Sequence, residues 1–243
     1  MLSNTAYSQL AKKDLKLPNG LSLSNQLEYS YDTENKREIL EDWFNLDYTN
    51  GIFTSGLRME VFQPNDPNPS ISRGKDRYAD IAYKYIGAKI GNRKSGLNII
   101  LGNFYGSFGR GIIFKSYEDR NIRIDNNLFG LSLEGNYSNF RLRALSGSAA
   151  NINNERKDIL HAVDLEYRGF KKLRMGASFA TNLSENDNNA STNLVGFRIS
   201  PNLGLLDIYA EYAVKMNSDI KKSTFNNDRD IIGRAFYTNL NIY

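Results

Sequence analysis

Residues 21–31 read LSLSNQLEYSY, and apolar and polar side chains alternate along nearly the whole stretch. Three leucines and two tyrosines fall on one phase, while serine, glutamine and glutamate fall on the other. Successive side chains of a β-strand point to opposite faces of its sheet. Alternation with this period therefore predicts a strand that has one apolar face and one polar face.

The same alternation recurs along the rest of the chain and predicts an all-β protein. Leucine, isoleucine, valine, phenylalanine and tyrosine dominate the apolar phase, as is typical of strands. Counting one strand for each run gives an antiparallel sheet of about twelve strands. The runs lie at 21–31, 44–48, 53–61, 79–85, 97–101, 129–137, 140–144, 163–167, 173–179, 195–199, 206–214 and 236–242.

Short and long connections alternate between these runs. The short ones include Asn50-Gly51, a strong hairpin signal. In an up-and-down antiparallel sheet every second connection returns to the same end, so one end carries short turns and the other carries long loops, as in bacterial outer-membrane barrels. The long, polar connections lie at 32–41, 63–77, 105–127, 147–158, 182–192 and 216–230.

This pattern predicts an antiparallel up-and-down transmembrane β-barrel of about twelve strands at 21–243, preceded by an N-terminal periplasmic segment at 1–20. A soluble β-sandwich, such as a carbohydrate-binding module, is an alternative that would bury its apolar faces between two sheets. Residues 1–16 lack the apolar core and cleavage site of a secretory signal. The barrel interpretation therefore requires that a signal peptide was removed from this chain.

The composition is compatible with a barrel and excludes several other classes of protein. Mean hydropathy is −0.52, and no run approaches the ~20 apolar residues of a membrane helix. Barrel strands are polar on average because lipid-facing and lumen-facing residues alternate. The 15 tyrosines and 13 phenylalanines would supply aromatic girdles, and the absence of cysteine excludes disulfides and thiolate metal sites. The net charge of +4 comes from interspersed residues of both signs, so we expect no nucleic-acid partner.

The polar phase carries charges of both signs, which a barrel would direct into its lumen. Arg141 and Arg143 lie one strand away from Asp164 and Glu166, so cross-strand ion pairs are expected. The charges form either a pore lining that selects solutes or a salt-bridged network that fills a narrow barrel. We predict that the lumen is lined by Arg58, Glu60, Lys84, Glu134, Arg141, Arg143, Asp164, Glu166, Arg174, Arg198, Asp207 and Glu211.

The longest connection combines closely spaced glycines with aromatic and charged side chains. Glycine lets one backbone segment approach another closely and adopt unusual dihedral angles. One hypothesis is that this connection folds inward and constricts the lumen, with Arg110 as an electrostatic gate. The alternative, which we favour because long loops commonly lie at the surface, is a surface loop or a hairpin above the membrane. The candidate constriction residues are Phe108, Arg110, Lys115, Glu118, Asp119, Arg120 and Arg123.

No catalytic site, cofactor or metal is predicted. His161 is the only histidine, and it shares the apolar phase of Val163 near a strand end. A catalytic histidine needs a nucleophile and an acid that converge on it, and no serine-elbow motif is present. We therefore interpret His161 as an interfacial residue and expect no enzyme.

Residues 102–130 resemble a signature of uncharacterised, porin-like outer-membrane proteins of Bacteroidota. The opening Pro18-Asn19-Gly20 and the strand around Trp43 are also similar. The resemblance covers a small part of the chain and implies an outer-membrane location and a barrel, but no activity and no catalytic residues. Members of that family are longer than this chain, which leaves open that it is part of a larger barrel. The motifs are Gly-Asn-Phe-Tyr (102–105), Phe-Gly-Arg-Gly (108–111), Tyr-Glu-Asp-Arg (117–120) and Ile-Asp-Asn-Asn-Leu-Phe-Gly (124–130).

We therefore expect an outer-membrane β-barrel that acts as a passive channel for small polar solutes. The alternative is a non-conducting barrel that serves as a structural or assembly partner at the cell surface. The expected partners are the lipid bilayer, small polar solutes, and either another membrane protein or a second copy of the chain.

Overall fold

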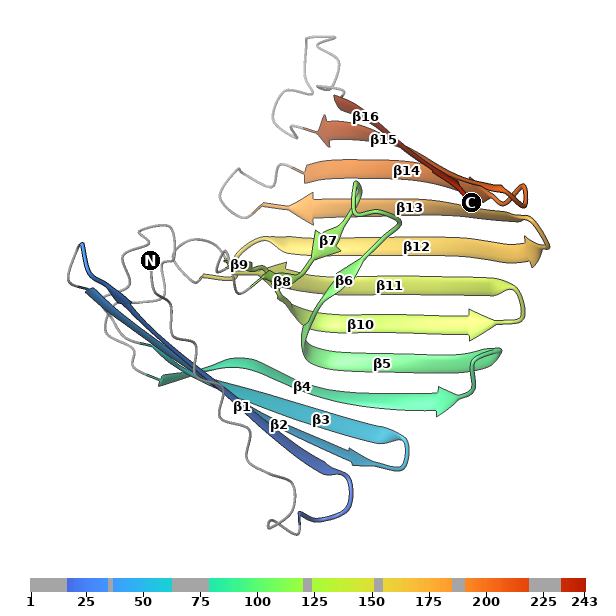
Figure 1. Cartoon of the computed structure of the whole chain (residues 1–243). Helices are drawn as coiled ribbons and strands as arrows, with labels where there is room; N and C mark the ends of the chain where they lie inside the picture. Colours follow the sequence, from blue (N-terminus) through green and yellow to red (C-terminus); the bar gives the residue numbers. More distant parts are fainter. Residues whose placement is uncertain are drawn as a thin grey trace. The chain divides into compact units, whose positions relative to one another are not determined.

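The computed structural model is all-β and describes residues 17–34, 37–62, 79–119, 124–150, 155–184, 191–218 and 233–243. Twelve long strands form an antiparallel sheet in the order β1-β2-β3-β4-β5-β10-β11-β12-β13-β14-β15-β16 (Figure 1). None of the described residues forms a helix long and apolar enough to cross a membrane. The long strands are β1 (Leu21–Asp32), β2 (Arg37–Asn50), β3 (Phe53–Phe62), β4 (Ala79–Gly91), β5 (Ser95–Phe104), β10 (Leu128–Tyr137), β11 (Phe140–Ala149), β12 (Ile159–Phe170), β13 (Leu173–Leu183), β14 (Ser191–Pro201), β15 (Leu206–Ser218) and β16 (Gly233–Ile242).

All twelve predicted runs lie within these strands, so the antiparallel all-β prediction is confirmed. One predicted connection is wrong, because β2 begins at Arg37 and only residues 33–36 join it to β1. Glu41 pairs with Glu28 on β1 and with Phe62 on β3, so neighbours on both sides hold this part of β2 in the sheet. These partners outweigh the weak strand preference of its charged residues.

The strand order begins with β1 and ends with β16, and the described residues contain no pairing between these two strands. The structure therefore establishes the antiparallel sheet, whereas closure of the sheet into a barrel is a proposal.

The chain divides into two compact units. The first comprises Met1–Lys89 with Asn151–Glu155, and the second comprises Ile90–Ala150 with Arg156–Tyr243. The first holds β1 to β3 and most of β4. The second holds the other eight long strands together with four two-residue strands, β6 (Gly106–Ser107), β7 (Lys115–Ser116), β8 (Glu118–Asp119) and β9 (Ile124–Asp125).

A β-bulge in the first unit changes the face on which Lys84 lies. Met59 pairs with Ile81, but Arg58 pairs with Tyr83, so the register shifts by one residue between these pairs. Directly paired residues share a face of the sheet, and Lys84 pairs with Leu57. Lys84 therefore lies on the face opposite to Arg58 and Glu60, and the prediction that it shares their face is wrong. An extra residue in one strand reverses the side-chain alternation beyond it.

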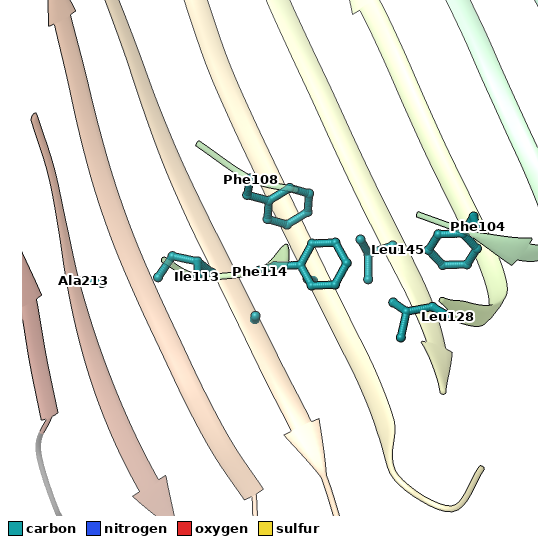
Figure 2. Packing of buried hydrophobic residues seen from close by; sticks show 9 residues of the cluster. Phe104, Phe108, Ile113, Phe114, Leu128, Leu145 and Ala213 are labelled. Atoms are coloured by element: carbon teal, nitrogen blue, oxygen red, sulfur yellow. The ribbon is translucent and has the colours of Figure 1, made fainter. Parts of the chain in front are cut away.

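The second unit has one apolar face that is exposed and one polar face. Large apolar side chains of the first face are widely exposed, including Phe197 (60%), Phe236 (67%) and Leu240 (60%). Residues of the opposite phase point to the other face of the sheet. They are charged, small or buried, as are Arg198, Glu211 and Ala213. The buried hydrophobic cluster of this unit includes Phe108 and Phe114, which come from the segment between β5 and β10 (Figure 2).

Candidate functional site

The strand register places nine of the predicted charged residues of the second unit on one face of its sheet. Glu134 pairs with Arg143 on the next strand, and Arg143 pairs in turn with Asp164. Two residues away from Arg143 on the same strand, Arg141 pairs with Glu166. The nine residues are Glu134, Arg141, Arg143, Asp164, Glu166, Arg174, Arg198, Asp207 and Glu211. We call this the polar face.

Small residues occupy one part of the polar face, which we call the floor. Ala162, Ala180, Gly196 and Ala213 lie on four consecutive strands, β12 to β15. The three alanines are at most 3% exposed. At Gly196 a Cβ atom would lie 2.6 Å from Cγ1 of Ile113. The small side chains therefore make room for groups that come from elsewhere in the chain.

Those groups come from residues 105–119, which we call the docked loop. Strand β6 pairs with β7, and between them the Phe108 amide donates a hydrogen bond to the Phe114 carbonyl at 3.0 Å. The rings of Phe108 and Phe114 meet edge to face, with their centroids 5.3 Å apart. Both rings and Ile113 are buried and belong to the cluster that includes the alanines of the floor (Figure 2).

Polar contacts also fix the docked loop to the polar face. The Arg110 amide donates to Oε2 of Glu211 at 3.0 Å, and Nη1 of Arg143 donates to the Ser107 carbonyl at 2.6 Å. The Arg143 guanidinium also lies over the Phe108 ring, 5.0 Å from its centroid. In Figure 1, β6 and β7 accordingly run in front of the strands of the second unit.

Gly109 is required where the docked loop meets β15. Its φ of +53° lies in the left-handed region, which favours glycine. A Cβ atom at this position would lie 2.6 Å from Oε2 of Glu211 and 2.7 Å from the Tyr209 hydroxyl.

We expect Gly109→Ala to release the docked loop. An unfavourable φ costs of order 1–3 kcal/mol, and the close contacts with Glu211 add to this cost. Trypsin cleavage after Arg110 should become faster by about tenfold or more, because proteolysis follows the population of the open state. The matched control is Gly135→Ala, since the nearest atom to its Cβ would be 3.9 Å away. Equal cleavage rates in the two variants would contradict the docking.

The buried carboxylate of Asp164 is the centre of an ion-pair network. Its side chain is fully buried, and it accepts hydrogen bonds from Arg143 at 2.6 Å, Arg198 at 2.5 Å and Ser178 at 2.6 Å. Arg198 lies two strands away, beyond β13. It can cross β13 because Gly176 has no side chain, as a Cβ atom there would lie 2.4 Å from Cζ of Arg198.

One predicted cross-strand ion pair is confirmed, whereas Arg141 and Glu166 bind other partners than expected. Arg143 binds Asp164, as expected. Arg141 binds Glu134 at 2.8 Å on the other side of its strand. Glu166 accepts hydrogen bonds from Arg198 at 3.1 Å and from Arg168.

A cavity of about 300 Å³ lies between Arg110 of the docked loop and the strands β12 to β16. Its lining includes Arg174 and Arg198, the carboxylates of Glu166 and Asp207, and Tyr209. The Arg110 guanidinium lies over the Tyr209 ring, 5.3 Å from its centroid. The cavity is at the lower end of the size range of ligand pockets.

A second group of contacts fixes the chain where it returns from the docked loop to β10. Nδ2 of Asn103 donates to Oδ1 of Asn127 at 2.6 Å. The Arg156 guanidinium donates to the same oxygen at 2.8 Å and to the Ser148 carbonyl at 2.5 Å. Burial lowers the pKa of Arg156, and the nearby carboxylate of Asp125 counteracts this effect.

The docked loop contains five of the seven candidate constriction residues. Phe108 is buried on the polar face and Arg110 lines the cavity, so this segment packs against the sheet and the surface loop that we favoured is wrong for it. Constriction of a lumen stays a prediction. Lys115 lies over the Tyr117 ring, and Glu118 and Asp119 form β8. Arg120 and Arg123 lie outside the described residues.

Several residues that build the site were missed from the sequence. Tyr209 lies on the polar phase and was not among the candidate residues, although its hydroxyl donates to Glu211 at 2.6 Å. Gly176 and Ser178 were overlooked because they carry no charge. Small residues at polar-phase positions of consecutive strands were a usable signal, since such positions leave room for another segment.

The fold and its site define an antiparallel β-sheet protein that carries a docked loop over a charged face. The chain belongs to a family of unknown function, DUF6029, whose model matches residues 8–243. No curated protein matches the chain.

Proposed function

We propose that the protein is an outer-membrane β-barrel that acts as a porin-like, passive channel for small polar solutes. The observation that carries this proposal is the contrast between the two faces of the sheet in the second unit. Exposed apolar side chains cover one face, and charged side chains cover the other. Contiguous exposed apolar surface marks contact with a membrane or a partner, and barrel strands direct alternate residues to lipid and lumen.

The lengths of the connections support the same proposal. In the second unit, residues 138–139, 171–172 and 202–205 form short turns at one end of the strands. The connections at the other end are longer, and residues 105–127 between β5 and β10 make the longest of them. Outer-membrane barrels have short periplasmic turns and longer extracellular loops. The short-turn end would then face the periplasm, and the docked loop would enter the lumen from outside.

A non-conducting barrel is the second candidate, and one specific observation favours it. The docked loop and the Asp164 network bury part of the polar face, so side chains already occupy space that a channel would leave to water. In this role the protein would act as a structural or assembly partner at the cell surface.

Reconstitution tests the proposal and separates the two candidates. The protein should float with lipid vesicles, and in a planar bilayer it should give stable conductance steps. Folding is verified beforehand by heat-modifiable gel mobility. Flotation without conductance would favour the non-conducting barrel. A folded protein that stays soluble without detergent and does not bind vesicles would contradict a membrane location.

A further inference from the structure

We infer that the cavity beneath Arg110 is a binding subsite for small solutes that carry an oxyanion, either a carboxylate or a phosphate group. This inference deepens the proposed function and rests on it, since the subsite serves transport only if the polar face lines a channel.

Both acidic groups of the lining accept hydrogen bonds within the protein. Glu166 accepts hydrogen bonds from Arg168 and Arg198. Asp207 accepts one from the side chain of Asn202. Arg198 is in turn engaged by Asp164 and Glu166. Asp207 keeps its negative charge because Asn202 is neutral, but the three arginines of the lining outnumber its two carboxylates.

The excess positive charge of the lining comes from two arginines on different parts of the chain. Arg110 belongs to the docked loop and Arg174 to β13, and both side chains line the cavity. Within the described residues neither guanidinium has an ion-pair partner. The Tyr209 ring supports the Arg110 guanidinium from one side, which leaves its hydrogen-bond donors available.

Two such guanidinium groups fit an oxyanion better than a neutral or cationic solute. Arginine presents its donors in a planar fork that matches carboxylate and phosphate oxygens. The cavity volume of about 300 Å³ limits the ligand to a small solute. The cavity lies beside the docked loop, so the subsite would lie on the wall of the proposed channel.

Calorimetric titration of the folded protein in detergent with inorganic phosphate, and separately with succinate, tests the subsite. We expect Arg110→Gln and Arg174→Gln each to weaken binding by about tenfold, the loss expected for a charge-assisted hydrogen bond. The matched control is Lys172→Gln, which removes the same charge from an exposed turn two residues before Arg174. Equal binding by wild type and both arginine variants would overturn the subsite.

Reversal potentials in a planar bilayer under a KCl gradient separate this inference from the proposed function. Anion preference that falls in both arginine variants but not in Lys172→Gln supports both proposals. Conductance with unchanged preference and no phosphate binding overturns the subsite and leaves the channel intact. Phosphate binding that requires both arginines, without conductance, overturns the channel and keeps the subsite. The absence of binding and of conductance overturns both.

Discussion

Asp164→Ala is expected to lower the free energy of unfolding by about 3–5 kcal/mol, the cost of removing one partner from a buried ion pair. The Asp164 side chain is fully buried, and the Arg198 side chain is 6% exposed. Without the carboxylate, the guanidinium groups of Arg143 and Arg198 would repel each other with little water to screen them. Urea unfolding in lipid vesicles, followed by heat-modifiable gel mobility, measures the loss.

The matched control is Glu134→Ala, which breaks the ion pair with Arg141 on the same face. Those side chains are 34% and 27% exposed, so we expect a loss of less than about 1 kcal/mol. Similar losses in Asp164→Ala and Glu134→Ala would show that the buried network does not hold β12 and β14 together.

If the protein is the channel proposed above, replacing Ser107–Lys115 with a glycine-serine linker of equal length should raise its single-channel conductance several-fold. The replacement removes the buried rings of Phe108 and Phe114 and the anchor between the Arg110 amide and Glu211. A flexible linker lacks the apolar side chains that hold the loop on the floor. The cross-section open to ions should therefore increase, and single-channel recording in a planar bilayer measures the change.

Arg110→Gln provides the comparison for this replacement. It removes the guanidinium but keeps the buried rings, so conductance should stay within about twofold while ion preference shifts, because a charge at a constriction chiefly sets selectivity. If wild type conducts and the linker variant conducts no more, the docked loop does not narrow the proposed channel.

The strands could be predicted because each carries its own signal. Side-chain alternation is local, and the run at 206–214 is recognisable without knowledge of any partner strand. The start of β2 at Arg37 was missed because charged residues around Glu41 break the alternation, and only the pairing with β1 and β3 reveals the strand. The bulge in β4 was missed because residues 79–85 alternate without interruption, although Ile86, next to Tyr85, indicated a change of phase.

The candidate site could be predicted only in part, because its contacts depend on distances along and across the sheet. The polar phase identified the charged residues on one face. It did not identify the partners of these residues. Arg198, for example, can contact Asp164 only because Gly176, which lies between them, has no side chain. The packing of the docked loop on the polar face depends on small residues in four strands, and none of them signals such a contact by itself.

The hydrogen bond from the Arg110 amide to Glu211 joins residues that are 101 positions apart. This separation along the chain limits the order in which parts of the second unit can fold. Neighbouring strands form hairpins, whose local contacts close early. The loop precedes β10 in the chain, but its binding surface is complete only when β15 has joined the sheet. Protection of the loop from protease should therefore be among the last events of folding, and an intermediate that lacks β15 would leave the chain after Arg110 open to cleavage.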